Sequence, residues 1–347
     1  MLFPIDSKLA RPVAMRHQVL FILALMGSHL AGQAAEPVGV KRVTVGNYED
    51  CIELSNNDTT VVLCHQVGGR VIKYSWKGKE ALYLSEKENE WTPEQPLSKR
   101  EVSAGRFDIG PEYVIDRGLI LWAGEWKAEV LGDRRARLTS AEDPQSGVQL
   151  IREFTLDAES SHLACTQIIR NHSNETKRWC HWSRTFAKHG GVVAIPLTPE
   201  LSRMPKQYVM VDRHGHIDPK PEDPNIRIRE NFLEILAPPA FPKLGIDSYA
   251  GWFAYITPDD LAFVKSYQTY PDRNYNELAG YTISIWYPKT RIPACEIEPI
   301  GPATELAPNE SAAFTEHWRL MEHPFPKDGG QLDLNALSRQ VSRFVEN

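Results

Sequence analysis

Residues 292–320, IPACEIEPIGPATELAPNESAAFTEHWRL, contain two runs with the composition of β-strands, joined by a turn. The first run, Ala294–Glu298, lies between two prolines, which tend to bracket strands because proline cannot donate a hydrogen bond to a neighbouring strand. The second run, Ser311–Leu320, follows a Pro-Asn-Glu turn and ends near a tryptophan. Side chains alternate along a strand, so we expect Glu296 and Glu298 to share one face.

Two carboxyl groups on one strand face are an arrangement that general acid–base catalysis uses. Burial and like charge move the pKa values of such a pair apart, so that one carboxyl can give a proton while the other receives one. The alternative is a solvated strand face on which Glu296 and Glu298 only meet water. The spacing alone leaves both interpretations open.

The first 35 residues have the features of a secretory signal peptide. Basic residues precede the short apolar run Val19–Met26, and the small residues Ala34 and Ala35 mark a cleavage site. The apolar run is too short to span a bilayer of roughly 30 Å. We therefore expect a secreted or periplasmic protein that has no membrane span after cleavage.

Composition favours many short strands and excludes some partners. The chain has nine tryptophans, 25 prolines and a net charge of −6. The expected leader holds three basic residues and one acidic residue, so its removal takes the charge from −6 to −8. A nucleic-acid partner would call for a basic patch, and this balance argues against one. The sequence does not determine the oligomeric state.

The order of strand-like runs predicts a single β domain with a helix at its end. Short alternating runs recur from residue 43 to residue 320, and we also expect a strand around Trp122 and Trp126. In the tail Leu332–Val345, apolar residues recur at helical spacing. We therefore place a β domain at residues 36–325 and an amphipathic helix within residues 326–347.

Five cysteines all lie beyond the expected leader, and two pairings are hypotheses. Cys51 and Cys64 are equidistant from the turn at residues 57–58, so a tight hairpin would place them opposite each other. Cys165 and Cys180 flank a turn in a similar way, and export permits disulfides. Cys295 would remain a free, buried thiol.

The sequence motifs give little reason to expect a metal or a cofactor. The run Asp212–Asp218, DRHGHID, alternates imidazole and carboxylate groups that suit a divalent ion, although its glycine and the following prolines favour a polar surface loop. The chain contains no G-x-S-x-G, P-loop or G-x-G-x-x-G motif. We expect no cofactor and no metal, and we leave the Asp212–Asp218 alternative open.

Four blocks of the chain resemble one known family. They are Gly68–Leu84 (GGRVIKYSWKGKEALYL), Ala104–Pro111 (AGRFDIGP), Lys243–Tyr267 with its KLGIDSYAGWFAY run, and Glu296–Leu320. Together they resemble an exported bacterial family with a galactose-mutarotase-like domain, related to the aldose 1-epimerases. The resemblance implies an all-β supersandwich of twisted antiparallel sheets with a short C-terminal helix, and a carbohydrate ligand on the concave side of the larger sheet.

The resemblance also implies roles for individual residues. In mutarotase-like enzymes a strand histidine protonates the ring oxygen and a late glutamate takes the anomeric proton, which here suggests His181 and Glu298, with Glu296 as the alternative glutamate. Further contacts to the sugar are expected from Arg106, Lys265, Trp182 and Trp252. The asparagine–arginine pair typical of the epimerases is absent, because Arg106 follows a glycine.

Three functions remain open on this basis. The first is an aldose 1-epimerase-like isomerase, and the second is a non-catalytic sugar-binding protein that uses the same surface. The third is a polysaccharide lyase or hydrolase on the same fold. Convergence of the His181 and Glu298 side chains on one pocket would favour catalysis, whereas placement of the histidine in the core would favour binding.

Overall fold

The computed structural model describes residues 36–347 apart from 113, 115–117, 289–291, 328–329 and 346–347. The chain divides into two units, Met1–Glu36 and Pro37–Asn347, and every element below belongs to the second. The expected signal peptide lies outside the described residues, so export stays a prediction. Within the described part of the chain, no helix is long and apolar enough to cross a membrane.

The larger sheet has thirteen antiparallel strands in the described residues. Eleven of them form a continuous order, while β5 pairs only with β4 and β22 with β11. The order is β1 (Val40–Val45), β2 (Tyr48–Ser55), β3 (Thr59–Cys64), β4 (Arg70–Trp76), β6 (Gly105–Gly110), β11 (Lys177–Lys188), β21 (Ala294–Pro299), β20 (Ile283–Trp286), β17 (Lys243–Ile246), β13 (Tyr208–Val211) and β14 (Ile217–Asp218), with β5 at Lys79–Glu80 and β22 at Thr304–Leu306.

The smaller sheet has ten antiparallel strands. Buried and less buried residues alternate along its central strands, as expected where one face of a sheet is packed. The order is β15 (Ile226–Arg229), β16 (Phe232–Ile235), β12 (Val192–Pro196), β18 (Trp252–Thr257), β19 (Leu261–Tyr267), β23 (Ser311–Glu322), β10 (Leu163–Asn171), β9 (Val148–Leu156), β8 (Arg135–Thr139) and β7 (Lys127–Gly132).

The main core lies between the two sheets. Its buried apolar side chains come from the facing sides of both sheets and form one contiguous cluster. Tyr74 of the larger sheet lies 5.6 Å from Phe263 and 5.8 Å from Trp318 of the smaller sheet, measured between ring centroids. Removal of these large apolar surfaces from water is the main force that holds the sheets together.

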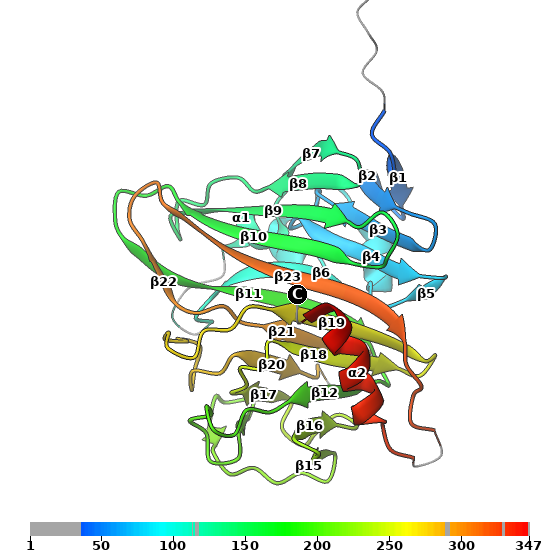
Figure 1. Cartoon of the computed structure of the whole chain (residues 1–347). Coiled ribbons are helices and arrows are strands. Elements are labelled where there is room, and N and C mark those ends of the chain that lie inside the picture. Colours follow the sequence, from blue (N-terminus) through cyan, green and yellow to red (C-terminus); the bar gives the residue numbers. More distant parts are fainter. Residues whose placement is uncertain (1–35, 113, 115–117, 289–291, 328–329, 346–347) are drawn as a thin grey trace, which may run out of the picture. The chain divides into compact units, whose positions relative to one another are not determined.

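The C-terminal helix α2 (Leu334–Val345) packs on the outer face of the smaller sheet (Figure 1). Leu334, Leu337 and Val341 are buried against outward-facing residues of β18 and β19, such as Ala254 and Val264. These three residues lie on the apolar face that the helical spacing of the tail predicts. The predicted all-β fold with a short C-terminal helix is confirmed.

The two strand runs of residues 292–320 belong to different sheets. Their strands, β21 and β23, form at the predicted positions, with β21 in the larger sheet and β23 in the smaller. Between them the chain forms β22, which pairs with β11. The segment therefore crosses from the larger sheet to the smaller one and connects the two layers of the sandwich.

Two local expectations are corrected by the structure. The segment around Trp122 is not a strand, because Leu119–Ala123 forms the short helix α1. Cys165 and Cys180 cannot pair where they lie, since Cys165 is in the core between the sheets and Cys180 is in a separate cluster on the other side of β11. The hairpin between them connects one sheet to the other, which separates the two thiols.

Cys51 and Cys64 do lie opposite each other. They follow the pair Ile52–Leu63 in the register of β2 and β3. Both thiols are buried, and they contact each other through a hydrogen bond. All five cysteines are free thiols in the structure, so a Cys51–Cys64 disulfide stays a prediction.

Candidate functional site

Charged side chains gather on the face of the larger sheet that points away from the smaller sheet. Alternation along β6, β11 and β21 places Arg106, Arg184, Glu296 and Glu298 on this face, and their strand neighbours in the core. We call the following residues the charged cluster: Arg106, Asp108, Glu112, Arg184, Lys243, Glu277, Glu296 and Glu298.

Arg184 is the centre of the charged cluster. Its Nε lies 3.1 Å from Oε1 of Glu298 and 3.4 Å from Oε1 of Glu296. Its two terminal nitrogens contact Asp108 at 3.3 Å and Glu112 at 3.1 Å. One guanidinium group thus holds four carboxyl groups that come from two strands and a loop, which its planar fork of donors makes feasible.

Two further cations form ion pairs in the cluster. Arg106 contacts Glu296, and Lys243 contacts Glu112. Only Glu112 is substantially accessible, with 26% of its side chain exposed, whereas Glu296 and Glu298 are each 1% exposed. The cluster is therefore a mostly desolvated set of charges that opens to solvent near Glu112.

Aromatic rings surround the cations. The Arg106 guanidinium lies 4.0 Å from the ring centre of Phe186 and 4.9 Å from that of Trp122. Trp182 lies 4.6 Å from the guanidinium of Arg184 and 4.9 Å from Nζ of Lys243. These cation–π contacts compensate part of the cost of removing the three cations from water.

The carboxyl groups of the cluster have divergent pKa values. Burial, followed by the neighbouring charge of Glu296, raises the pKa of Glu298 to about 8. Burial also acts on Glu296, but the charges of Arg106 and Arg184 outweigh it and hold the pKa of that carboxyl below its usual range. One strand therefore presents a protonated and an ionised carboxyl side by side at neutral pH.

A second pair of carboxyl groups diverges in the same way. Burial raises the pKa of Glu277 to about 7. Burial opposes ionisation of Glu112 as well, but Arg184 and Lys243 overcome it and lower the pKa of Glu112 to about 2. The cluster thus holds two carboxyl groups that carry a proton close to neutral pH.

Several buried polar atoms in and beside the charged cluster lack a hydrogen-bond partner among the described residues. They include Nε1 of Trp182 and Oε1 of Glu277. Buried polar groups in folded proteins are nearly always hydrogen-bonded, so such atoms call for a water or a ligand. The Trp182 N–H is a donor, and the Glu277 carboxyl accepts a hydrogen bond when it is ionised and donates one when it is protonated. Hydroxyl groups both donate and accept, so a polyhydroxylated molecule suits these two groups.

His181 lies on the opposite face of the larger sheet from Glu298. Its ring stacks between Phe107 and Phe314 at 5.9 and 5.8 Å, and its Nε2 lies 3.1 Å from the carbonyl oxygen of Ala312. It is 2% exposed, and burial lowers its pKa to about 4. His181 and Glu298 therefore do not converge on one pocket, which is the arrangement that would favour catalysis.

Lys265 also lies in the core and does not reach the charged cluster. It is fully buried between the sheets, where Nζ contacts Thr185 at 2.7 Å, Ser183 at 3.2 Å and Glu316 at 3.1 Å. The expectation that Lys265 faces a ligand is corrected by this position. Its inward direction follows from the alternation along β19.

The remaining sequence-based candidates fall into two places. Arg106, Glu296 and Trp182 belong to, or line, the charged cluster around Glu298. Trp252 lies instead on the outer face of the smaller sheet, where its ring contacts Phe232. Roles in ligand binding stay predictions for all of them.

The run Asp212–Asp218 forms an exposed turn. One carboxylate oxygen of Asp212 accepts hydrogen bonds from the backbone N–H groups of His214 and His216, at 2.8 and 2.9 Å. The other oxygen lies 3.1 Å from Nδ1 of His216. Within the described part of the chain, no group of three or more His, Cys, Asp or Glu side chains is arranged to hold a metal ion.

Sequence reasoning missed the central residues of the cluster. Arg184 could have been found, because it shares a strand face with Trp182 and lies opposite Arg106 in the register of β6 and β11. Lys243 begins β17, and only the order of strands brings it near. Glu277 lies outside the strands, so no sequence period marks it.

Similar solved structures identify the architecture. A galactose mutarotase-like protein from Clostridium acetobutylicum matches at a TM-score of 0.55 and 12% identity, covering 82% of this chain and 99% of that one. A galactose mutarotase-like protein from Lactobacillus casei matches at 0.54 and 10% identity, covering 78% and 100%. The chain has the galactose mutarotase-like fold.

A further match with this fold is the galactose mutarotase related enzyme from Lactobacillus acidophilus, at a TM-score of 0.50 and 11% identity, covering 81% of this chain and 100% of that one. No protein-family model and no curated protein matches the sequence. Identities this low establish the galactose mutarotase-like fold and leave the activity to be argued from the site.

Proposed function

We propose that this chain is an exported carbohydrate-binding protein that holds its ligand at the charged cluster. The observation that carries this proposal is the combination, on one sheet face, of ion-paired charges, aromatic rings and the unpartnered N–H of Trp182. Aromatic rings contact the apolar face of a sugar, while fixed charges and N–H groups orient its hydroxyls. The galactose mutarotase-like fold agrees with this ligand class.

Binding is favoured over the predicted histidine–glutamate mechanism because of where the histidine lies. Opening a sugar ring requires one group that gives a proton and one that receives a proton on the same substrate. His181 is stacked in the core, and a protein layer separates it from Glu298. An aldose 1-epimerase-like reaction would therefore need another proton donor.

A second candidate function supplies that donor from the cluster itself. Glu298, with a pKa raised to about 8, carries a proton at neutral pH, and its neighbour Glu296 is ionised. Glu298 would protonate the ring oxygen of an aldose while an ionised carboxylate accepts the anomeric proton. The lyase or hydrolase alternative stays a prediction that no particular residue contact favours.

Ligand binding can be tested by saturation-transfer NMR with D-glucose, D-galactose and their methyl glycosides. We expect Trp122→Ala and Lys243→Met to weaken binding about tenfold, because the first removes an aromatic ring and the second a cation of the cluster. Glu129→Gln, at a surface strand, is the matched control and should bind as the wild type does. Equal binding by all variants would contradict the proposed location.

Catalysis can be tested by polarimetry on freshly dissolved α-D-glucose and α-D-galactose. Under the second candidate function, the wild-type protein accelerates the change in rotation and Glu298→Gln loses that acceleration. Binding without acceleration, in both proteins, would leave carbohydrate binding as the function. Acceleration that survives in Glu298→Gln would exclude Glu298 as the proton donor.

A further inference from the structure

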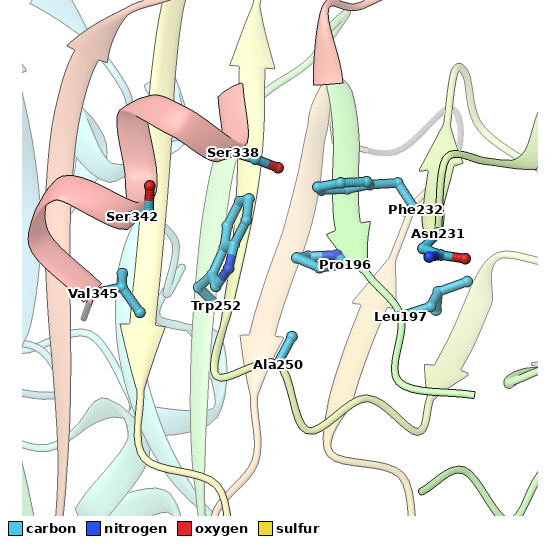
Figure 2. A pocket seen from close by; sticks show the side chains of 9 residues that line it. All are labelled: Pro196, Leu197, Asn231, Phe232, Ala250, Trp252, Ser338, Ser342 and Val345. Atoms are coloured by element: carbon cyan, nitrogen blue, oxygen red, sulfur yellow. The ribbon is translucent and has the colours of Figure 1, made fainter. Parts of the chain in front are cut away.

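A cavity lies on the opposite side of the sandwich from the charged cluster. It has a volume of about 360 Å³ and is formed between α2 and the outer face of the smaller sheet (Figure 2). Ligand sites in proteins have volumes of roughly 300–1,000 Å³, so a small molecule fits. The lining residues include Pro196, Asn231, Phe232, Trp252, Ser338 and Ser342.

Two aromatic rings form the apolar part of this cavity. The rings of Trp252 and Phe232 lie 5.8 Å apart and meet edge to face at 66°. Phe232 is 6% exposed, whereas Trp252 is only half-buried and presents part of its indole to the cavity. Figure 2 shows the indole between the serines of α2 and the side chains of Phe232 and Pro196.

Neutral polar groups form the rim. Ser342 donates a hydrogen bond to the carbonyl oxygen of Arg339 at 3.3 Å, so that its lone pairs remain available. The Ser338 hydroxyl and the Asn231 side-chain amide make no hydrogen bond to the described residues, and both stand at the cavity. The described lining side chains are all uncharged. The cavity therefore selects for a neutral ligand that has hydroxyl groups beside an apolar face.

We propose that this cavity is a second carbohydrate site that binds one neutral pyranose ring. The C–H face of the sugar would lie against Trp252, and its hydroxyls would meet Ser338 and Asn231. A lipid or apolar peptide would leave these three polar rim groups facing hydrocarbon, which costs free energy. The site shares no residue with the charged cluster, so it does not depend on the function proposed for that cluster.

The experiment titrates the whole protein with methyl β-D-galactopyranoside, methyl β-D-glucopyranoside and cellohexaose, followed by saturation-transfer NMR. We expect at least one of these neutral sugars to bind and Trp252→Ala to weaken that binding about tenfold, because the stacking ring is lost. Ser338→Tyr, on an accessible helix position, fills the cavity and should weaken it at least as much. Trp76→Ala, which removes a half-buried tryptophan from the larger sheet, is the matched control.

The outcomes separate this site from the charged cluster. Binding that is weakened in Trp252→Ala and Ser338→Tyr but kept at the wild-type level in Trp76→Ala supports the proposal. Binding that depends on Glu298 and survives both cavity variants would place the sugar at the charged cluster and overturn it. The proposal is also overturned if none of the neutral sugars binds, or if a fatty acid probe displaces the sugar from the wild-type protein.

Discussion

Arg184 and Glu298 lie buried side by side on the outer face of the larger sheet, where Nε of Arg184 donates a hydrogen bond to Oε1 of Glu298 at 3.1 Å. The same guanidinium contacts Glu296, Asp108 and Glu112, so one cation lies against four carboxyl groups. Burial opposes its charge, but these carboxylates hold the pKa of Arg184 well above its usual range. The stability of the candidate site and its proton content both depend on this one side chain.

Arg184→Met should destabilise the protein strongly. Removal of one partner of a buried ion pair costs about 3–5 kcal/mol, because the remaining charges stay buried and uncompensated. The measurement is the free energy of unfolding from urea titration at neutral pH. Arg137→Met breaks the half-exposed pair with Glu153 and should cost only about 0–1 kcal/mol. Equal costs for the two variants would contradict the central role of Arg184.

Glu298 should make the protein less stable at alkaline pH. Its folded-state pKa of about 8 exceeds the unfolded value of 4.5, so the folded state binds the proton more tightly. The resulting stability is fully present below about pH 4.5 and is lost as the pH rises through 8. Urea titrations from pH 5 to pH 9 should therefore show a decline for the wild type and a smaller decline for Glu298→Gln. A decline of the same size in both proteins would argue against a raised pKa.

His181 should make the protein sensitive to acid. Its folded-state pKa is about 4 and its unfolded value 6.5, so the unfolded state binds the proton more readily. The contribution of neutral His181 to the free energy of unfolding is fully present above pH 6.5. It is lost as the pH falls towards 4, by roughly 3 kcal/mol in total. His181→Phe keeps a ring between Phe107 and Phe314, and it should flatten the stability profile between pH 6.5 and pH 5. The exposed turn residue His214, changed to Gln, is the control and should leave the profile unchanged.

Cys51 and Cys64 should form a disulfide when the protein is oxidised. The two thiols face each other across β2 and β3, and a disulfide-containing oxidant such as oxidised glutathione would accept their two electrons. Intact-mass analysis should show the loss of two hydrogens, and the bond should add about 2–4 kcal/mol to stability. Cys51→Ser should abolish both effects, whereas Cys165→Ser should not. A mass unchanged after oxidative refolding would rule the pairing out.

The strands and the terminal helix were predictable because they follow from local periodicity. Alternation along Ala294–Glu298 correctly placed Glu296 and Glu298 on one face, which is buried in the structure, and apolar spacing correctly placed the last helix. Local pattern failed where the chain changes layers. The turn between Cys165 and Cys180 has a composition typical of turns within one sheet. In the structure, however, it leads from the smaller sheet to the larger one.

The candidate site was only half predictable for the same reason. Arg106, Glu296 and Glu298 belong to blocks that resemble a known family and could be named. Lys243 reaches the cluster only through strand order, and Glu277 comes from the segment between β19 and β20. His181 was assigned to the site although its strand parity differs from that of Trp182 and Arg184. Odd and even positions along a strand point to opposite faces, so position groups residues by face. It does not say which of the two faces meets the other sheet.

The sequence by itself determined the all-β class, the positions of most strands and the shared face of the two late glutamates. These depend on the alternation of side chains along a strand, which is a property of neighbouring residues. The tertiary structure decided which face is core and which is site, because that choice depends on how the two sheets bury their apolar sides. The inward turn of His181 and the placement of Arg184 beside Glu298 are both consequences of that burial.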